Sequence, residues 1–235
     1  MANNEKNDLP VISTTKRNDF VEIKFTGYSN GNIFDSNIEE DLKKINPDAK
    51  IKELITIIGQ GMVIQGFDKA LEDKEVGKEY VIEIPSKEGF GERKRELIKT
   101  IPLKVFTAKE VMPKPGMVLA LDENLVKIVA VSGARVVADF NNPLSGKDLS
   151  YKFTIVRILE DEKEKIKNLF GLVFGFAPDF EITDKVVVSG QPFLESFVKA
   201  FKDKFKELIG KDLEFRLKEP EKEKREEENK PEEKQ

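Results

Sequence analysis

The chain has 235 residues, of which 36% are charged and 39% hydrophobic, and its net charge is −4. This composition is typical of a soluble protein with one or two compact domains, and it gives no reason to expect nucleic-acid or membrane binding. The absence of cysteine and histidine excludes disulfides, thiolate nucleophiles, histidine-based catalytic triads and the commonest metal ligands.

Other common functional signals are also missing. The glycines form no phosphate-binding or dinucleotide-binding pattern. No apolar leader begins the chain, and no stretch reaches the roughly 20 apolar residues of a membrane span. We therefore expect a cytoplasmic protein that needs no cofactor and no metal.

The first quarter of the chain predicts an antiparallel sheet that follows a mobile start. Residues 1–18 are polar and are expected to be mobile. Residues 20–25 alternate as a half-buried strand does, and Ser29–Asn32 has the composition of a hairpin turn. The charged stretch 37–53 predicts an exposed loop with a short helix, and further strands are expected at 55–58 and 80–84.

The segment GQGMVIQGF, residues 59–67, combines three glycines with the apolar triplet Met62, Val63 and Ile64. Glycine permits a positive φ and the close approach of another chain. Phe67 then begins an amphipathic run that continues with Ala70 and Leu71. This pattern predicts either a shallow apolar pocket at a helix start or an ordinary buried junction between strand, turn and helix.

Residues 92–142 predict a small β-rich module, with strands at 118–121, 125–131 and 135–140. Most of its apolar residues are expected in its core; they are Val111, Met112, Met117, Val118, Leu119, Leu121 and Val137. Met112 and Met117 flank a proline-rich turn and are the best candidates for adaptable contacts with another chain. A clear strand follows at 149–155.

The last third predicts a small α/β domain over residues 160–219. Two apolar stripes at helical spacing are expected to be core: Ile166, Leu169, Phe170, Val173 and Phe174, and then Phe193, Phe197, Phe201, Phe205 and Leu208. Strands are expected at 185–188 and 213–217. Residues 220–235 are almost all charged or proline and predict a disordered tail.

Four segments in this order resemble the FKBP-type peptidyl-prolyl isomerases: residues 20–37, 59–67, 76–91 and 148–159. The resemblance covers 19–91 and 143–159. Residues 92–142 interrupt it where the SlyD-like branch carries an insert-in-flap chaperone domain. The α/β segment and charged tail resemble the long archaeal members, and without histidine the metal-binding tail of bacterial members has no counterpart.

The resemblance implies an α+β fold in which a twisted antiparallel sheet wraps around a short helix, with the substrate site between them. It assigns the floor of the site to Phe67, the walls to Phe25 and Phe34 with Asp35 beside them, and the flap to Phe90. Val63 and Ile64 supply a ledge next to Met62, and the Ile64 N–H is expected to bond the substrate carbonyl. The last wall aromatic falls on Tyr151, or on Phe153 if the alignment slips by two residues, and Leu144 is a further substrate contact.

Two departures from the family stand out. Phe25 and Phe90 occupy positions where tyrosine is common, so Asp35 is expected to lack its usual phenol partner. The resemblance implies a peptidyl-prolyl isomerase that acts on unfolded or proline-containing chains, with client capture by the insert. The alternative is a holdase, acting near the ribosome, with a weak or vestigial isomerase pocket. A third idea assigns dimerisation to the C-terminal domain.

Overall fold

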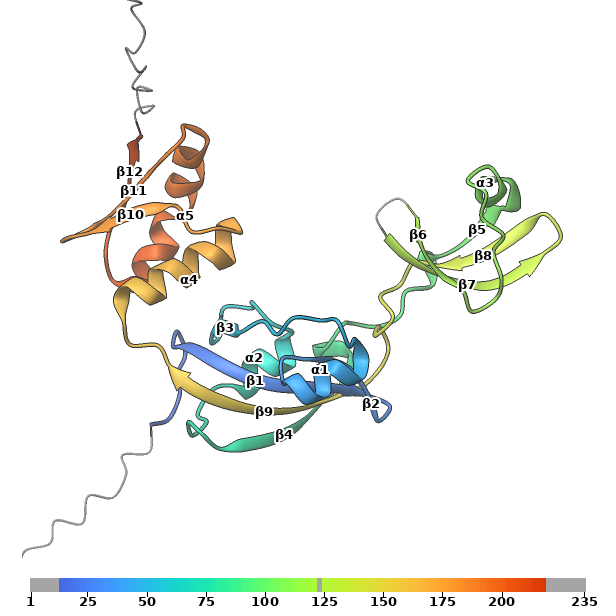
Figure 1. Cartoon of the computed structure of the whole chain (residues 1–235), viewed down its shortest axis with the longest axis horizontal. Helices are drawn as coiled ribbons and strands as arrows, with labels where there is room; N and C mark the ends of the chain where they lie inside the picture. Colours follow the sequence, from blue (N-terminus) through green and yellow to red (C-terminus); the bar gives the residue numbers. More distant parts are fainter. Residues whose placement is uncertain (1–12, 122–123, 219–235) are drawn as a thin grey trace, which may run out of the picture. The chain divides into compact units, whose positions relative to one another are not determined.

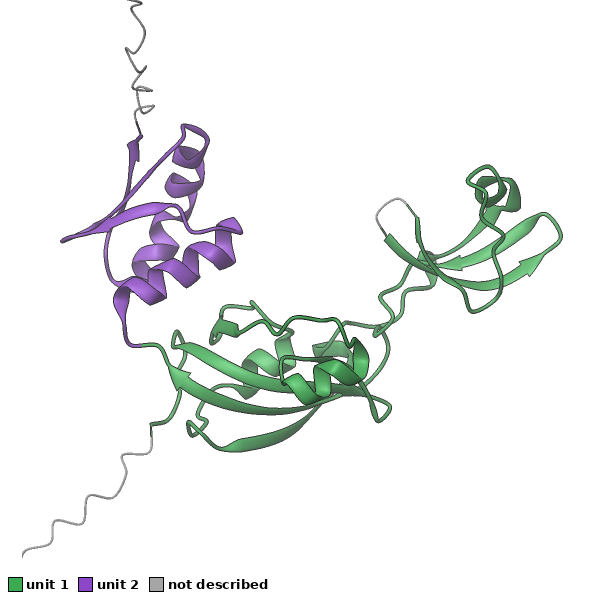
Figure 2. Cartoon of the chain, viewed as in Figure 1, with its two compact units in different colours: residues 1–159 green, residues 160–235 purple. Residues whose placement is uncertain are grey.

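The computed structural model describes residues 13–121 and 124–218. The chain divides into two compact units, Met1–Leu159 and Glu160–Gln235 (Figure 2). The expected disordered tail and most of the expected mobile N-terminus lie outside the described residues.

The main sheet of the first unit is antiparallel, with the order β2-β1-β9-β4 and with β3 paired to β1 (Figure 1). Its strands are β1 (Phe20–Ser29), β2 (Asn32–Ser36), β3 (Leu54–Ile57), β4 (Glu79–Ile84) and β9 (Leu149–Ile158). Every second residue of β9 from Leu149 to Ile155 is buried, as a strand with one covered face requires. The pairing of Phe25 with Phe153 and of Gly27 with Tyr151 fixes which side chains share that face.

Residues 13–18 are tied to this sheet, so the expectation of a mobile segment is wrong for them. The Thr15 side chain is fully buried, and its hydroxyl donates to the Leu71 carbonyl over 2.6 Å. The Asn18 N–H donates to the Ile58 carbonyl. Hydrogen bonds to residues distant in the sequence thus fix residues 13–18, although their polar composition had predicted a mobile segment.

Two short helices accompany the sheet. The exposed helix α1 (Glu39–Ile45) lies in the expected charged loop, and its Asp41 carboxylate accepts from Thr26 on β1 over 2.8 Å. Helix α2 (Gln65–Ala70) packs on the covered face of the sheet through Phe67. A Cβ at Gly66 would lie 2.5 Å from the Ile84 side chain, so only glycine lets α2 approach β4 this closely.

A second sheet has the order β5-β8-β7-β6, with strands β5 (Ile98–Pro102), β6 (Val118–Leu121), β7 (Asn124–Ser132) and β8 (Arg135–Asp139). Helix α3 (Leu103–Thr107), which the sequence pattern did not predict, buries Phe106 in its core. The expectation that most of the seven apolar residues named above lie in this core is wrong. Only Leu121 of those named is buried; Val111, Leu119 and Val137 are half-buried, and Met112, Met117 and Val118 are exposed.

The two segments that lead into and out of this second sheet are fastened to each other. Asn141 donates to the Lys94 carbonyl and accepts from the Lys94 N–H, and Asp139 pairs with Arg93. Burial alone would raise the pKa of Asp139, but hydrogen bonds from Asn141 and Arg93 outweigh it and hold the pKa below its ordinary value. The carboxylate therefore stays charged near neutral pH, and its contribution to stability is lost only as the pH falls through that lowered pKa.

The second unit contains a three-stranded sheet in the order β10-β11-β12 and two helices (Figure 1). Its elements are α4 (Glu162–Phe174), β10 (Asp179–Ile182), β11 (Val186–Gly190), α5 (Phe193–Ile209) and β12 (Leu213–Leu217). Strands β11 and β12 are parallel, with α5 as the crossover between them. Asp161 caps α4 by accepting from the Glu164 N–H.

The apolar stripes of this unit are only partly core, which corrects the prediction. Ile166, Leu169, Phe170 and Phe205 are buried. Phe193 and Phe197 at the start of α5 are 57% and 56% exposed, and Val173 on α4 is also exposed. Phe174, whose ring contacts those of Phe197 and Phe201, is half-buried.

Within the ranges 13–121 and 124–218, no helix is both long enough and apolar enough to cross a membrane.

Candidate active site

Five aromatic side chains meet between α2 and the main sheet. The Phe67 ring stacks on Tyr151 at 4.7 Å between ring centroids and lies 6.1 Å from Phe25. Phe34 meets Tyr151 edge-on at 5.7 Å and Phe90 edge-on at 6.3 Å. Phe67, Phe25 and Tyr151 are buried, while Phe34 and Phe90 are half-buried. We call these five residues the aromatic cluster.

Gly27 makes room for the cluster in the middle of the sheet. It pairs with Asp35 on β2 and with Tyr151 on β9. A Cβ at this position would lie 2.7 Å from the Phe34 ring and 3.1 Å from the Tyr151 ring. The bare backbone of Gly27 therefore lets rings from both neighbouring strands close over it.

Polar side chains at the end of β2 and directly after it hydrogen-bond to the backbone around Phe25, and sequence reasoning missed them. Asn37 accepts from the Phe25 N–H over 2.8 Å and donates to the Ile23 carbonyl over 2.7 Å. The Ser36 hydroxyl donates to the Phe25 carbonyl over 2.9 Å. These hydrogen bonds fix the C-terminal end of β2 against β1, next to Phe34 and Asp35.

The backbone of the glycine-rich segment 59–64 is hydrogen-bonded to the side chain of Asp68, another residue that sequence reasoning missed. The buried Asp68 carboxylate accepts from the N–H groups of Gly59 and Gly61, each over 2.8 Å. Both glycines have positive φ values, 76° and 67°, which a residue with a side chain adopts only at a cost. The segment thus leads into α2 in a defined path.

Val63 and Ile64 end this segment and pack against the buried hydrophobic core to which Phe25, Phe67 and Tyr151 belong. Ile64 is the residue that precedes the first turn of α2. Among the described residues, the Ile64 N–H has no hydrogen-bond partner, and the N–H groups at the start of a helix lack intrahelical partners in any case. A donor beside apolar rings is therefore available to a carbonyl group.

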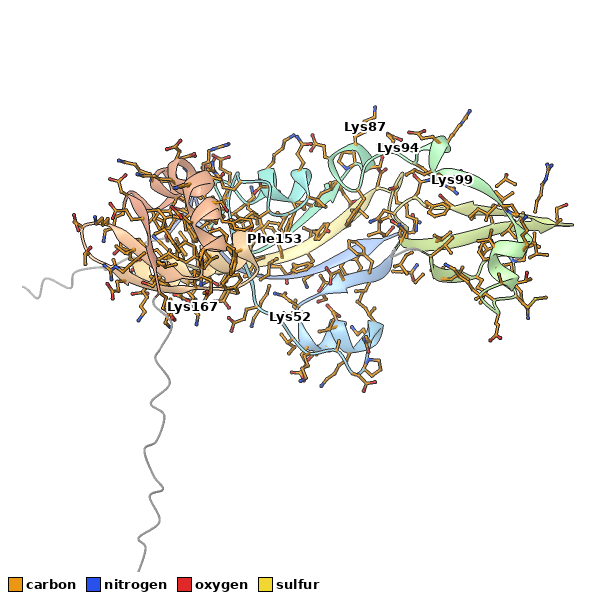
Figure 3. The ribbon with its side chains drawn as sticks, turned by 90° about the horizontal axis from the view of Figure 1, so that it is seen from above. Lys52, Lys87, Lys94, Lys99, Phe153 and Lys167 are labelled. Carbon is orange, nitrogen blue, oxygen red and sulfur yellow. The ribbon has the colours of Figure 1, made fainter. Side chains whose placement is uncertain are left out.

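Tyr151, and not Phe153, is the β9 ring that contacts Phe25 and Phe34. Tyr151 contacts Phe25, Phe34 and Phe67, whereas Phe153 lies deeper, against Phe67 and Tyr80, among the packed side chains of the sheet (Figure 3). These contacts favour the assignment of the last wall position to Tyr151 over the assignment to Phe153.

Tyr151 also changes the expectation for Asp35. Burial raises the pKa of the Tyr151 hydroxyl well above its ordinary value, and the negative charge of Asp35 adds to the rise. Asp35 is exposed, and it is aligned with Tyr151 across Gly27. Position 25 carries no phenol, and the Tyr151 hydroxyl on β9 lies close enough to Asp35 for the two to interact electrostatically.

The flap around Phe90 is hydrogen-bonded to the return segment, which we define as residues 140–148 between β8 and β9. The Gly91 N–H donates to the Ser86 carbonyl, and the Ser145 hydroxyl donates to the Phe90 carbonyl over 3.2 Å. Leu144 and Phe90 both pack against the buried hydrophobic core that includes Phe25, Phe67 and Tyr151. The return segment after β8 therefore supports the flap directly.

Three predicted site residues lie apart from the cluster. Met62 is half-buried in the glycine-rich segment and is not part of the packed group. Met112 and Met117 belong to the stretch between α3 and β6 and are 69% and 41% exposed. All other predicted site residues lie in the cluster or next to it.

Comparison with known proteins agrees with this geometry. Residues 13–106 match the family model described as FKBP-type peptidyl-prolyl cis-trans isomerase, and residues 99–144 match a model described as FKBP26, IF domain. The short-type peptidyl-prolyl cis-trans isomerase of Methanocaldococcus jannaschii is 34% identical over 148 residues, which cover 62% of this chain and 93% of that protein. The chain belongs to the FKBP-type peptidyl-prolyl cis-trans isomerase family.

More distant FKBP relatives match a shorter stretch. The SlyD isomerases of Yersinia pestis and Escherichia coli K12 are 30% and 29% identical over 114 and 111 residues. These matches cover 47% and 46% of this chain and 58% and 57% of the SlyD proteins. The chain thus spans more than half of each SlyD protein.

The aromatic cluster suits the reaction of an FKBP. Rotation about an amide bond has a barrier of about 18–20 kcal/mol because the planar form is stabilised by resonance. Water stabilises the polar planar form more than the twisted form. An apolar site that replaces water therefore lowers the free-energy difference between the two forms, and with it the barrier to rotation. No bond is made or broken, and the reaction needs no nucleophile, titrating base or metal.

The hydroxyl of Tyr151 provides a direct test of how the site works. We expect Tyr151→Phe to lower kcat/KM about fivefold, the equivalent of one hydrogen bond of about 1 kcal/mol. Because the raised pKa keeps this hydroxyl protonated, activity should be flat between about pH 6 and 9. A protease-free peptide isomerisation assay measures kcat/KM and its dependence on pH. The addition of Phe25→Tyr to the Tyr151→Phe variant should restore its rate. An unchanged kcat/KM in Tyr151→Phe would show that only the ring matters.

Proposed function

We propose that this isomerase acts on unfolded or nascent chains in the cytoplasm, and that residues 92–142 capture those chains as a chaperone module. The observation that carries the proposal is the exposure of large apolar side chains over this stretch, Met112 and Met117 among them. The match of residues 99–144 to an IF domain supports it. Flexible methionine side chains adapt to many apolar partners.

The same surface favours a second activity, the holding of unfolded chains that contain no proline. An apolar surface binds without regard to proline, whereas the aromatic cluster is shaped for a proline ring. In this alternative the module prevents aggregation and catalysis contributes little. The two activities separate when a proline-free client is used.

The test compares the binding of a proline-free unfolded client by two exposed-surface variants. We expect Met112→Ser/Met117→Ser to weaken capture about tenfold, because two apolar contacts of about 0.7 kcal/mol each are lost. Val81→Ser is the matched control, since Val81 on β4 is 65% exposed but lies on the main sheet. Equal capture by the wild type and the methionine variant would show that Met112 and Met117 do not contribute to client binding.

Dimerisation through residues 160–219 remains a prediction, and we propose it on a new observation. Phe193 and Phe197 present an apolar face at the start of α5, and large exposed apolar patches commonly mark interfaces. A second copy of the chain could cover this face. Light scattering of the full chain and of a chain that ends at Glu160 measures the difference, and a monomeric full chain would refute the proposal.

A further inference from the structure

A cavity of about 590 Å³ lies beside the second sheet of the first unit. One wall is apolar and comes from the outward-facing residues Val118 on β6 and Leu125 and Val129 on β7, all of which are exposed. The other wall is polar and includes Asn142 and Ser145 of the return segment. The volume falls within the range of about 300–1,000 Å³ that is usual for ligand sites.

The return segment contributes to both the cavity and the surroundings of the aromatic cluster. Leu144 packs against the hydrophobic core that includes Phe25, Phe67 and Tyr151, while its neighbours Pro143 and Ser145 line the cavity. The Ser145 hydroxyl also donates to the carbonyl of Phe90, a member of the cluster. The cavity and the cluster are therefore linked through residues 143–145.

The charges that line the cavity leave a positive excess. Arg93 is neutralised by Asp139, which also accepts from Asn141. Lys127 and Lys147 are exposed, and neither forms an ion pair with another described residue. Two lysines thus face the cavity without a carboxylate to balance them within the described part of the chain.

We propose that this cavity binds the part of a client chain that flanks the proline, and that it selects flanking segments in which apolar residues are combined with carboxylates. The proposal rests on the proposed function, because it takes the client to be an unfolded polypeptide. An extended chain advances about 3.3 Å per residue, so a segment only a few residues from the proline would reach the cavity. The apolar wall would take aliphatic side chains, and Lys127 and Lys147 would pair with aspartate or glutamate.

The test uses two sets of peptides that carry a pair of glutamates, a pair of glutamines or a pair of lysines. The first set has a single proline with the pair placed at increasing distances on either side, and isomerisation gives KM and kcat. The second set has no proline and a fluorescent label, and anisotropy gives its affinity. We expect the glutamate peptides to have about a fivefold lower KM than the glutamine peptides at one range of spacings, with kcat unchanged.

The Lys127→Glu/Lys147→Glu variant should abolish this preference in both sets. Lys24→Glu/Lys104→Glu is the matched control, because it has the same net charge and alters two exposed lysines outside the cavity. The preference should also shrink as salt shortens the range of charge interactions. A preference that survives in the Lys127/Lys147 variant, or that disappears equally in the control, would overturn the proposal.

The two readouts also separate this proposal from the proposed function. In one outcome the chain isomerises proline peptides and captures unfolded clients but shows no preference for glutamate. This outcome refutes only the proposed role of the cavity and leaves the proposed function intact. A chain that prefers the proline-free glutamate peptide but captures no unfolded protein keeps the cavity and refutes the chaperone role.

Discussion

A chain in which a short glycine-serine linker replaces residues 92–142 is expected to lose about 100-fold of its catalytic efficiency on a proline-limited refolding protein. The reason is tethering, since a client held by one module reaches a linked site at an effective concentration that raises apparent affinity about 10²–10⁴-fold. Its efficiency on a short proline peptide without flanking carboxylates or aliphatic residues should be unchanged, because such a peptide needs only the aromatic cluster. Refolding kinetics and peptide isomerisation measure the two quantities on the same preparation.

The structure indicates that this deletion is compatible with folding of the main sheet. The Gly146 N–H donates to the Gly91 carbonyl over 2.8 Å, so the two sides of the cut lie close together. Strands β4 and β9 pair with each other from Glu79 to Ile84 without help from the deleted stretch. Retained peptide activity is therefore the internal control, and an equal loss on protein and peptide substrates would argue against client capture by residues 92–142.

Most of the strands and both long helices were predictable because their patterns are local, whereas the short strands β2, β5 and β10 were not predicted. Alternation along 149–155 predicted β9, and the helical spacing of Ile166, Leu169 and Phe170 predicted α4. Such patterns identify the residues that share a face, but they do not reveal what covers that face. For this reason Phe193 and Phe197 were placed in a core, although the structure leaves them exposed.

The ring positions of the site could be inferred only from the family resemblance, and their arrangement depends on sheet register. Tyr151 is distant from Asp35 in sequence, and the two are brought together because both pair with Gly27. No local signal in the sequence indicates such a pairing. The phenylalanine at position 25 predicted that the usual phenol is missing there, but no local pattern predicted that Tyr151 on another strand lies within electrostatic range of Asp35.

Replacement of Asp68 by alanine is expected to cost about 3 kcal/mol of unfolding free energy, because two hydrogen bonds to a charged acceptor are lost and two N–H groups lose their partner. Asp68 was missed because a carboxylate among Gln65, Lys69 and other polar residues looks like part of a solvated helix face. In the structure its side chain is buried and holds Gly59 and Gly61. Urea unfolding of Asp68→Ala measures the cost, and Asp48→Ala, at an exposed position, is the control.

The same change should lower kcat/KM about tenfold at temperatures where the variant remains folded. The segment that Asp68 holds leads directly to Ile64, and a donor that moves even slightly from its productive position loses much of its effect. Asp68→Asn should fall between wild type and Asp68→Ala, because one amide oxygen can accept from one of the two N–H groups. A loss of stability with unchanged kcat/KM would mean that Asp68 supports the fold without positioning the Ile64 N–H, and it would remove this donor from the account of catalysis.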